Sequence, residues 1–112
     1  MTDTPCGRMF GWMFYLKGVS CSGGHVTELD LRNNQLSGSI PESLGNFSKL
    51  KKLFLSGNNL CGDIPLSLMN LNETSLSLSL GTNHLKASDP KLIAWLNDKD
   101  STWAENQTPC PK

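Results

Sequence analysis

A phrase that repeats within the chain restricts the possible folds more than any other feature of the sequence. LDLRNNQLSGSIP, from Leu29 to Pro41, returns as LFLSGNNLCGDIP, from Leu53 to Pro65. A third and shorter copy, SLSLSLGTNHLKA, begins at Ser75. Copies at a regular interval indicate a repeat architecture, in which each unit buries its apolar face against the next one.

The copies divide residues 26–88 into two full units and one partial unit. The full units cover residues 26–49 and 50–74, and the partial unit covers residues 75–88. Each unit follows LxxLxLxxNxL, with Val26 and Ser75 at the first leucine position of two of them. The full units continue with LxGxIPxxLxxL, in which Phe47 replaces the last leucine of the first unit. Residues 1–25 and 89–112 are therefore expected to form caps at the two ends.

Leucines alternate with polar residues in each unit, which is the pattern of a strand with one buried face. Three such strands at a fixed interval predict a parallel sheet in a short α/β coil. The second half of each full unit adds apolar residues that we expect to face the same interior. The predicted core consists of Leu29, Leu31, Leu53, Leu55, Leu78 and Leu80 from the strands, with Ile40, Leu44, Phe47, Ile64, Leu68 and Leu71.

An asparagine follows each expected strand, where the chain must turn away from the sheet. A buried asparagine amide can both donate and accept hydrogen bonds, and so can satisfy backbone groups that the bend leaves unpaired. We therefore predict structural roles for Asn34, Asn58 and Asn83.

The repeat pattern stops after Leu85, and SDPKLIAWLNDK follows. Asp89 is a suitable helix N-cap, and Pro90 suits the first helical position because its missing N–H is not needed there. An amphipathic helix is expected to cover the open end of the core. Its apolar face would consist of Leu92, Trp95 and Leu96, with Trp103 packed in the same cap.

Composition argues against several functional classes. Lysine plus arginine equals aspartate plus glutamate, at ten each, so the chain lacks the basic patch that nucleic-acid binding requires. The apolar run MFGWMFYL, from Met9 to Leu16, is too short to span a membrane. His25 and His84 are isolated, and no phosphate-binding loop or nucleophile motif occurs. We expect no enzyme activity, no metal and no cofactor.

The repeats resemble those of the plant-type leucine-rich-repeat family, whose units carry LxGxIP after the strand. That family includes receptor-kinase ectodomains, polygalacturonase inhibitors and secreted bacterial proteins. The tail, DPKLIAWLNDKDSTWAENQT, is similar to the closing segment of the bacterial members. The resemblance implies a right-handed solenoid with a parallel sheet on its concave face, an N-terminal cysteine cap and a C-terminal capping helix.

The front of the chain departs from that family pattern. TDTPC and GVSC look like the N-terminal cap, which implies a Cys6–Cys21 disulfide. Leu16, however, stands where the family has a tryptophan, and the spacer between the two cysteines is longer than usual. We interpret residues 1–25 as a truncated or rearranged cap. Its apolar run would cover the first coil and offers a route to self-association.

Cys61 replaces Ser37 of the first unit, at a position that the pattern leaves free. Four cysteines without CxxC spacing suit disulfides and an oxidising compartment rather than a zinc site, although they allow three pairings. With Cys6 and Cys21 paired, elimination leaves a Cys61–Cys110 disulfide that would attach the tail to the second unit. The alternative is two free thiols.

The outward positions of the strands are the remaining candidate site. The resemblance implies that ligands dock on this concave face, and Phe54 is the candidate aromatic anchor. The alternative is a lone exposed phenylalanine without a role. The predicted ligand-binding residues are Glu28, Asp30, Arg32, Asn33, Lys52, Phe54, Ser56, Ser77, Ser79 and Thr82.

The sequence therefore predicts a non-enzymatic protein- or peptide-binding module, extracellular or on the cell surface. Two alternatives stay open. The first is a structural fragment or end-cap of a longer repeat array with no ligand of its own. The second is an inhibitor of a secreted hydrolase.

Overall fold

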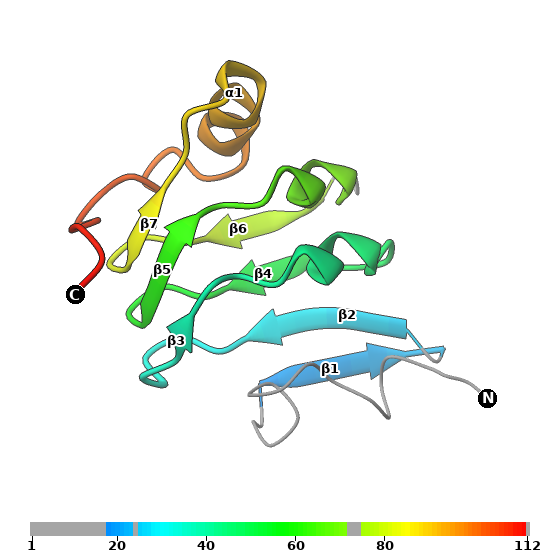
Figure 1. Cartoon of the computed structure of the whole chain (residues 1–112). Helices are drawn as coiled ribbons and strands as arrows, with labels where there is room; N and C mark the ends of the chain where they lie inside the picture. Colours follow the sequence, from blue (N-terminus) through cyan, green and yellow to red (C-terminus); the bar gives the residue numbers. More distant parts are fainter. Residues whose placement is uncertain (1–17, 24, 72–74, 112) are drawn as a thin grey trace.

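The computed structural model describes residues 18–23, 25–71 and 75–111. Within these residues the chain forms two sheets, and each repeat unit contributes one strand to the first sheet and then one strand to the second (Figure 1). The first sheet has the order β1-β2-β4-β6 and the second has the order β3-β5-β7. The strands are β1 (Val19–Ser22), β2 (His25–Asp30), β3 (Ser37–Gly38), β4 (Lys52–Phe54), β5 (Asn59–Asp63), β6 (Ser77–Ser79) and β7 (His84–Lys86).

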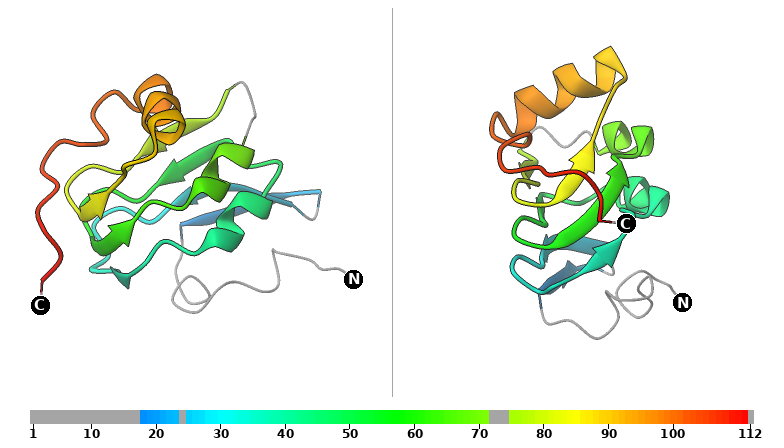
Figure 2. Two further views of the ribbon diagram at one scale, coloured as in Figure 1. Left: turned by 45° about the horizontal axis from the view of Figure 1, so that its top comes forward. Right: turned by 60° about the vertical axis from the view of Figure 1, so that its left-hand side comes forward.

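Short helices complete the units. Two 3-10 helices, η2 (Glu42–Asn46) and η3 (Leu66–Asn70), follow the two Ile-Pro turns and lie side by side (Figure 2). The single α-helix among the described residues, α1 (Pro90–Lys99), lies beyond β6 and β7, at the opposite end of the sheets from β1 (Figure 1). Asp89 caps α1, since its carboxylate accepts hydrogen bonds from the backbone N–H groups of Lys91 at 2.8 Å and Leu92 at 3.1 Å.

The parallel pairing of β2, β4 and β6 brings equivalent positions of the three units into register. Leu29, Leu53 and Leu78 are partners in neighbouring strands, and all three are buried. The remaining predicted core residues of the repeats, leucine, isoleucine and phenylalanine, are buried as well. In the closing segment, the buried apolar residues are Leu92, Leu96 and Trp103. The predicted core residues of the repeats are therefore confirmed, and Trp95 of the closing segment is only partly buried against the core.

Asn58 joins the first unit to the second. Its amide nitrogen donates to the carbonyl oxygens of Leu31 at 3.0 Å and Leu55 at 2.8 Å. Its amide oxygen accepts from the backbone N–H groups of Leu36 at 3.0 Å and Asn34 at 2.9 Å. One buried side chain thus satisfies backbone groups of two successive turns of the chain.

Asn83 repeats the arrangement one unit later. Its amide donates to the carbonyl oxygens of Leu55 at 3.0 Å and Leu80 at 3.1 Å, and its oxygen accepts from Leu60 N–H at 3.0 Å. For Asn34, the prediction of a buried amide is wrong. This side chain is exposed and donates to the carbonyl oxygen of Arg32. Asn58 and Asn83 each donate to a carbonyl oxygen of the unit before them, whereas Asn34 donates within its own unit.

The closing segment, residues 89–111, continues these hydrogen bonds without repeating the sequence. The amide of Gln107 donates to the carbonyl oxygen of Leu80 at 2.8 Å and accepts from Leu85 N–H at 2.8 Å. These are the third-unit equivalents of the bonds that Asn83 makes to Leu55 and Leu60. Gln107 therefore acts as the next member of the asparagine series.

Asp100 ends the first sheet in a similar way. Leu31 and Leu55 donate their N–H groups to carbonyl oxygens of the next strand, at 2.8 and 2.7 Å. Leu80, at the equivalent position, donates instead to the buried Asp100 carboxylate at 3.0 Å. A side chain thus replaces the strand that would come next.

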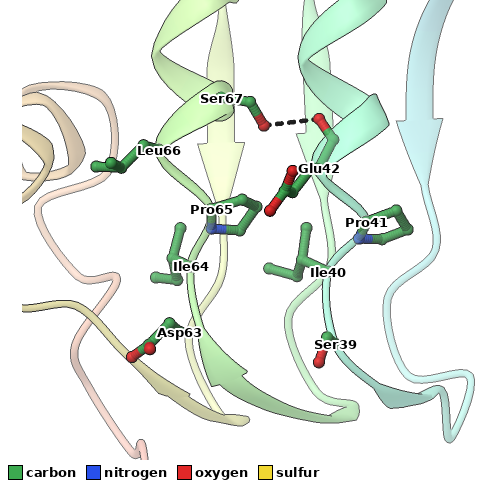
Figure 3. Close-up of a pocket in the computed structure, with 9 residues that line it drawn as sticks. All are labelled: Ser39, Ile40, Pro41, Glu42, Asp63, Ile64, Pro65, Leu66 and Ser67. Atoms are coloured by element: carbon green, nitrogen blue, oxygen red, sulfur yellow. Dashed lines mark hydrogen bonds between the residues drawn. The ribbon is translucent and has the colours of Figure 1, made fainter.

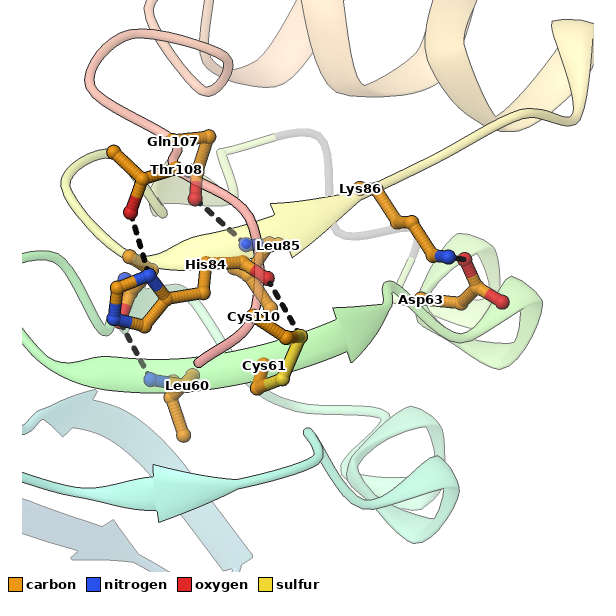
Figure 4. The surroundings of a disulfide bond; sticks show 10 residues. Leu60, Cys61, Asp63, His84, Leu85, Lys86, Gln107, Thr108 and Cys110 are labelled. Atoms are coloured by element: carbon orange, nitrogen blue, oxygen red, sulfur yellow. Dashed lines mark hydrogen bonds and ion pairs between the residues drawn. A yellow bond between two sulfur atoms is a disulfide. The ribbon is translucent and has the colours of Figure 1, made fainter. Parts of the chain in front are cut away.

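Cys61 and Cys110 form a disulfide, with their Cα atoms 5.4 Å apart and a sequence separation of 49 positions (Figure 4). This is the pairing that elimination left open, and it attaches the tail to β5. None of the described cysteines is free. Cys6 and the apolar run lie outside the described residues, so the Cys6–Cys21 disulfide and self-association through that run stay predictions.

Three features differ from the expectations. The second sheet was not predicted, because β3 contains only two residues, too few for a periodic signal. β1 pairs with β2 in antiparallel fashion, and Gly18 suits the contact because a Cβ there would collide with the carbonyl of Asp30. In the third unit, Ser75 at the first leucine position is exposed. The next residue, Leu76, is buried in its place.

Candidate binding face

The candidate binding face is the outward side of β2, β4 and β6, made of the ten predicted residues. Pairing in register sets Glu28 beside Lys52 and Ser77 in one row. A second row contains Asp30, Phe54 and Ser79. The structure therefore brings together six predicted residues that are far apart in the sequence. The other four, Arg32, Asn33, Ser56 and Thr82, follow the strand ends.

An ion pair fixes the edge of this face at the first unit. The guanidinium of Arg32 donates to both carboxylate oxygens of Asp30, from Nε at 2.8 Å and from Nη2 at 2.7 Å. These hydrogen bonds hold the pKa of Asp30 below its ordinary value, with a smaller contribution from the charge of Lys52. The same pair raises the pKa of Arg32. Both side chains remain partly exposed, so they can also reach a ligand.

Two cations approach the ring of Phe54. The guanidinium carbon of Arg32 is 4.9 Å from the centroid of this ring, and Nζ of Lys52 is 5.9 Å from the same point. Both distances are within the range of a cation–π interaction. Phe54 is partly buried rather than fully exposed, and it is not isolated, because two cations lie near its ring. The result is an aromatic ring held in position by Asp30, Arg32 and Lys52.

The other side of the face is small and polar. Ser77 and Thr82 are exposed, and Ser56 and Ser79 are partly buried. Asn33, Gly57 and Thr82 occupy equivalent turn positions, all with positive φ, at 59°, 72° and 57°. The left-handed conformation disfavours a β-branched residue such as threonine, so Thr82 is held there by its surroundings. Its N–H donates to the carbonyl oxygen of Glu105 in the closing segment at 3.0 Å.

Among the described residues, no group of three or more histidine, cysteine, aspartate or glutamate side chains is placed to hold a metal ion. His84 is outside the face, and its Nδ1 lies 2.6 Å from the hydroxyl of Thr108 (Figure 4). The described part of the chain also contains no helix that is long and apolar enough to cross a bilayer.

Phe54, Arg32 and Lys52 could be predicted from the sequence as residues of the face, but their contacts with one another could not. An alignment of the units would have set Phe54 beside Asp30, because they occupy equivalent positions. It could not have predicted which way the Arg32 side chain turns. That direction depends on the bidentate bond to Asp30, two residues earlier on the same strand end.

Residues 25–68 match the family model for leucine rich repeats in two copies. This segment therefore consists of leucine-rich repeats, in agreement with the parallel sheet and the leucine core. No curated protein sequence shows significant similarity to the chain.

Two solved structures of plant receptors resemble the chain. One is a plant peptide hormone receptor, RGFR1, in complex with RGF2, at 34% identity and a TM-score of 0.59 over 79% of this chain. The other is the leucine-rich-repeat ectodomain of the receptor kinase SOBIR1 from Arabidopsis thaliana, at 30% identity and a TM-score of 0.61 over 83% of this chain. The chain spans 16% of the first receptor chain and 52% of the second.

Proposed function

We propose that the chain is a non-enzymatic module that binds a protein or an extended peptide on the outward face of β2, β4 and β6. The observation that carries the proposal is the Phe54 ring, held by Arg32 and Lys52 in the middle strand of this face. A fixed aromatic side chain loses little conformational freedom on binding, and aromatic and arginine side chains dominate the energetics of interfaces.

The rows around Phe54 supply polar groups for orientation. Glu28, Asp30, Arg32 and Lys52 present both signs of charge, and the serines of β6 present hydroxyl groups. A peptide that crosses the three strands would meet a charged column, the aromatic ring and a small polar column in turn. The similar RGFR1 structure is that of a peptide hormone receptor in complex with RGF2, which supports a peptide as the ligand class.

A binding site outside the cytosol is part of the same proposal. Disulfides persist in oxidising compartments, and Cys61 is joined to Cys110. The two similar structures are receptor proteins of plants. Both observations support an extracellular or cell-surface location. The solenoid with a C-terminal capping helix also belongs to this proposal.

The proposal is tested by selecting peptides from a random display library against the full chain and measuring the affinity of a selected peptide by calorimetry. Phe54→Ala is expected to weaken binding about tenfold or more, which corresponds to an anchor residue of an interface. Leu66→Ala is the matched control, because Leu66 is an exposed apolar residue outside the candidate binding face. Equal affinities of the wild type and Phe54→Ala for the selected peptide would contradict the proposal.

A second candidate function is that of an end-cap of a longer repeat array. Asp100 and Gln107 favour it, because they occupy the hydrogen-bonding groups that a further unit would use. In that case the chain would contribute only its three strands to a larger face, and a library selection on the chain alone would yield no peptide. An inhibitor of a secreted hydrolase would use the same face, and inhibition assays against such enzymes would identify it.

A further inference from the structure

A groove runs along the turn side of the molecule, away from the candidate binding face. Its larger part is a hollow of about 840 Å³ between the Ile-Pro turns of the first two units (Figure 3). A smaller hollow of about 200 Å³ shares Asp63, Ile64 and Leu66 with it and continues to the start of α1. We call the two together the outer groove. None of its lining residues belongs to the candidate binding face.

The middle of the groove is apolar. Ile40 and Ile64 are buried, Pro41 and Pro65 are partly buried, and Leu66 is 54% exposed at the point where the two hollows meet. A leucine this exposed is the exception in this chain, whose other large apolar side chains among the described residues are buried or partly buried.

The turns that form the groove are held firmly together. The hydroxyl of Ser67 donates to the carbonyl oxygen of Glu42 at 2.6 Å, from one turn to the next (Figure 3). Gly45 permits this approach, because a Cβ there would collide with the backbone of Ser67. The groove is therefore formed before any ligand arrives, which lowers the entropic cost of binding.

The charged residues of the lining all have the same sign. Glu42, Asp63 and Asp89 are carboxylates, and neither hollow is lined by a lysine, an arginine or a histidine. Lys86 lies outside the lining and approaches Asp63 to 4.0 Å, with both side chains 73% exposed. An ion pair this long and this exposed is weak and leaves the carboxylate available to another cation. Asp89 is engaged with the first turn of α1.

We propose that the outer groove binds a basic peptide segment, with arginine or lysine side chains lying along the isoleucine and proline floor. The apolar stems of these side chains can cover apolar surface while their charged ends stay in water. The ends would then meet Glu42 and Asp63 at the rim. An acidic rim over an apolar floor favours a cationic side chain with a long stem over a purely aliphatic or an acidic one. This site is separate from the proposed function and does not depend on it.

The test uses a fluorescent peptide of alternating arginine and leucine, blocked at both ends, titrated with the full chain at low salt. We expect saturable binding that weakens as salt is added, because exposed charges are screened. A Glu42→Gln/Asp63→Asn variant is expected to bind about tenfold more weakly, from two exposed charge contacts of about 0.7 kcal/mol each. Leu66→Ser should also weaken binding, and Phe54→Ala should leave it unchanged.

Two controls make the test specific. The same peptide with glutamate in place of arginine is expected not to bind. Sedimentation of the unliganded chain shows whether a second copy occupies the groove instead. Three results would overturn the proposal. They are equal binding of the two peptides, unchanged binding by the Glu42→Gln/Asp63→Asn variant, and a dimer of the unliganded chain that Leu66→Ser dissociates. Loss of binding in Phe54→Ala alone would assign the peptide to the other face.

Discussion

The partial third repeat unit and the closing segment meet the same backbone requirements with different sequences. In the third unit, Asn83 connects its own turn of the chain to the one before it. In the closing segment, Gln107 makes the equivalent bonds, although it lies outside any repeat. Asp100 likewise accepts from Leu80 N–H the hydrogen bond that, in the earlier units, goes to a carbonyl oxygen of the next strand. The difference shows that backbone polar groups at the end of a sheet must be satisfied, but that any side chain of the right reach can satisfy them.

The largest expected effect concerns the disulfide that joins the closing segment to the repeats. A Cys61→Ala/Cys110→Ala variant is expected to lose about 4 kcal/mol of unfolding free energy, because the 49-residue separation leaves a long loop unconstrained in the unfolded chain. Urea unfolding of the variant and of the oxidised wild type measures this difference. A loss below about 1 kcal/mol would mean that the other contacts of the closing segment suffice to hold it.

The next effect tests the repeats. Asn83→Ala is expected to cost about 3 kcal/mol, because it leaves Leu60 N–H without its buried partner and removes one of the two side-chain donors to the carbonyl oxygens of Leu55 and Leu80. Asn34→Ala is the matched control, since Asn34 is exposed at the equivalent position of the first unit, and it should cost less than about 0.5 kcal/mol. Similar losses in the two variants, measured by thermal unfolding, would contradict the division into buried and exposed asparagines.

Gln107 tests whether the closing segment continues the asparagine series. We expect Gln107→Ala to cost about 2 kcal/mol, less than Asn83→Ala because the glutamine is only partly buried. Hydrogen exchange adds a local measurement, since the Leu85 amide should lose protection while the Leu60 amide keeps it. Asn70→Ala, which removes an exposed amide from η3, is the control for the loss of an amide as such. Full protection of Leu85 in Gln107→Ala would show that the glutamine is not its partner.

The smallest effect concerns the candidate binding face and depends on pH. Hydrogen bonds from Arg32 lower the pKa of Asp30 in the folded chain. The resulting stabilisation is fully present above the unfolded aspartate pKa of about 3.9 and is lost as the pH falls through the lower folded value. Because the pair is exposed, we expect less than about 1 kcal/mol. The free energies of unfolding of the wild type and Asp30→Asn, measured across this acid range, give the contribution. If the two free energies change with pH in the same way, the contribution is excluded.

The repeats could be predicted from the sequence because their physics is periodic. Leu29, Leu53 and Leu78 return at equal positions and must be buried against each other, so the strands, their register and the outward residues follow. Asn34 shows the limit of that reasoning, because an asparagine at the same position of the pattern is exposed in the first unit and buried in the second and third. Position along the array, as well as pattern, decides burial.

The closing segment and the sites were harder to predict for a physical reason. Gln107 and Asp100 act through reach and direction, which leave no periodic signal. The ring of Phe54 and the side chain of Arg32 meet because of a rotamer choice across two strands. The outer groove depends on turns that pack closely around Gly45, a contact between units that the sequence of one unit does not show.

The outward residues of β2, β4 and β6 are exposed or partly exposed, and we propose that this face binds the ligand. The most direct measurement is a titration of the isotope-labelled chain with a peptide selected against it, followed by NMR. We predict that shift changes concentrate on Arg32, Lys52, Phe54 and their neighbours in the three strands. Changes confined to the outer groove or to the closing segment, with these strands unaffected, would contradict the claim.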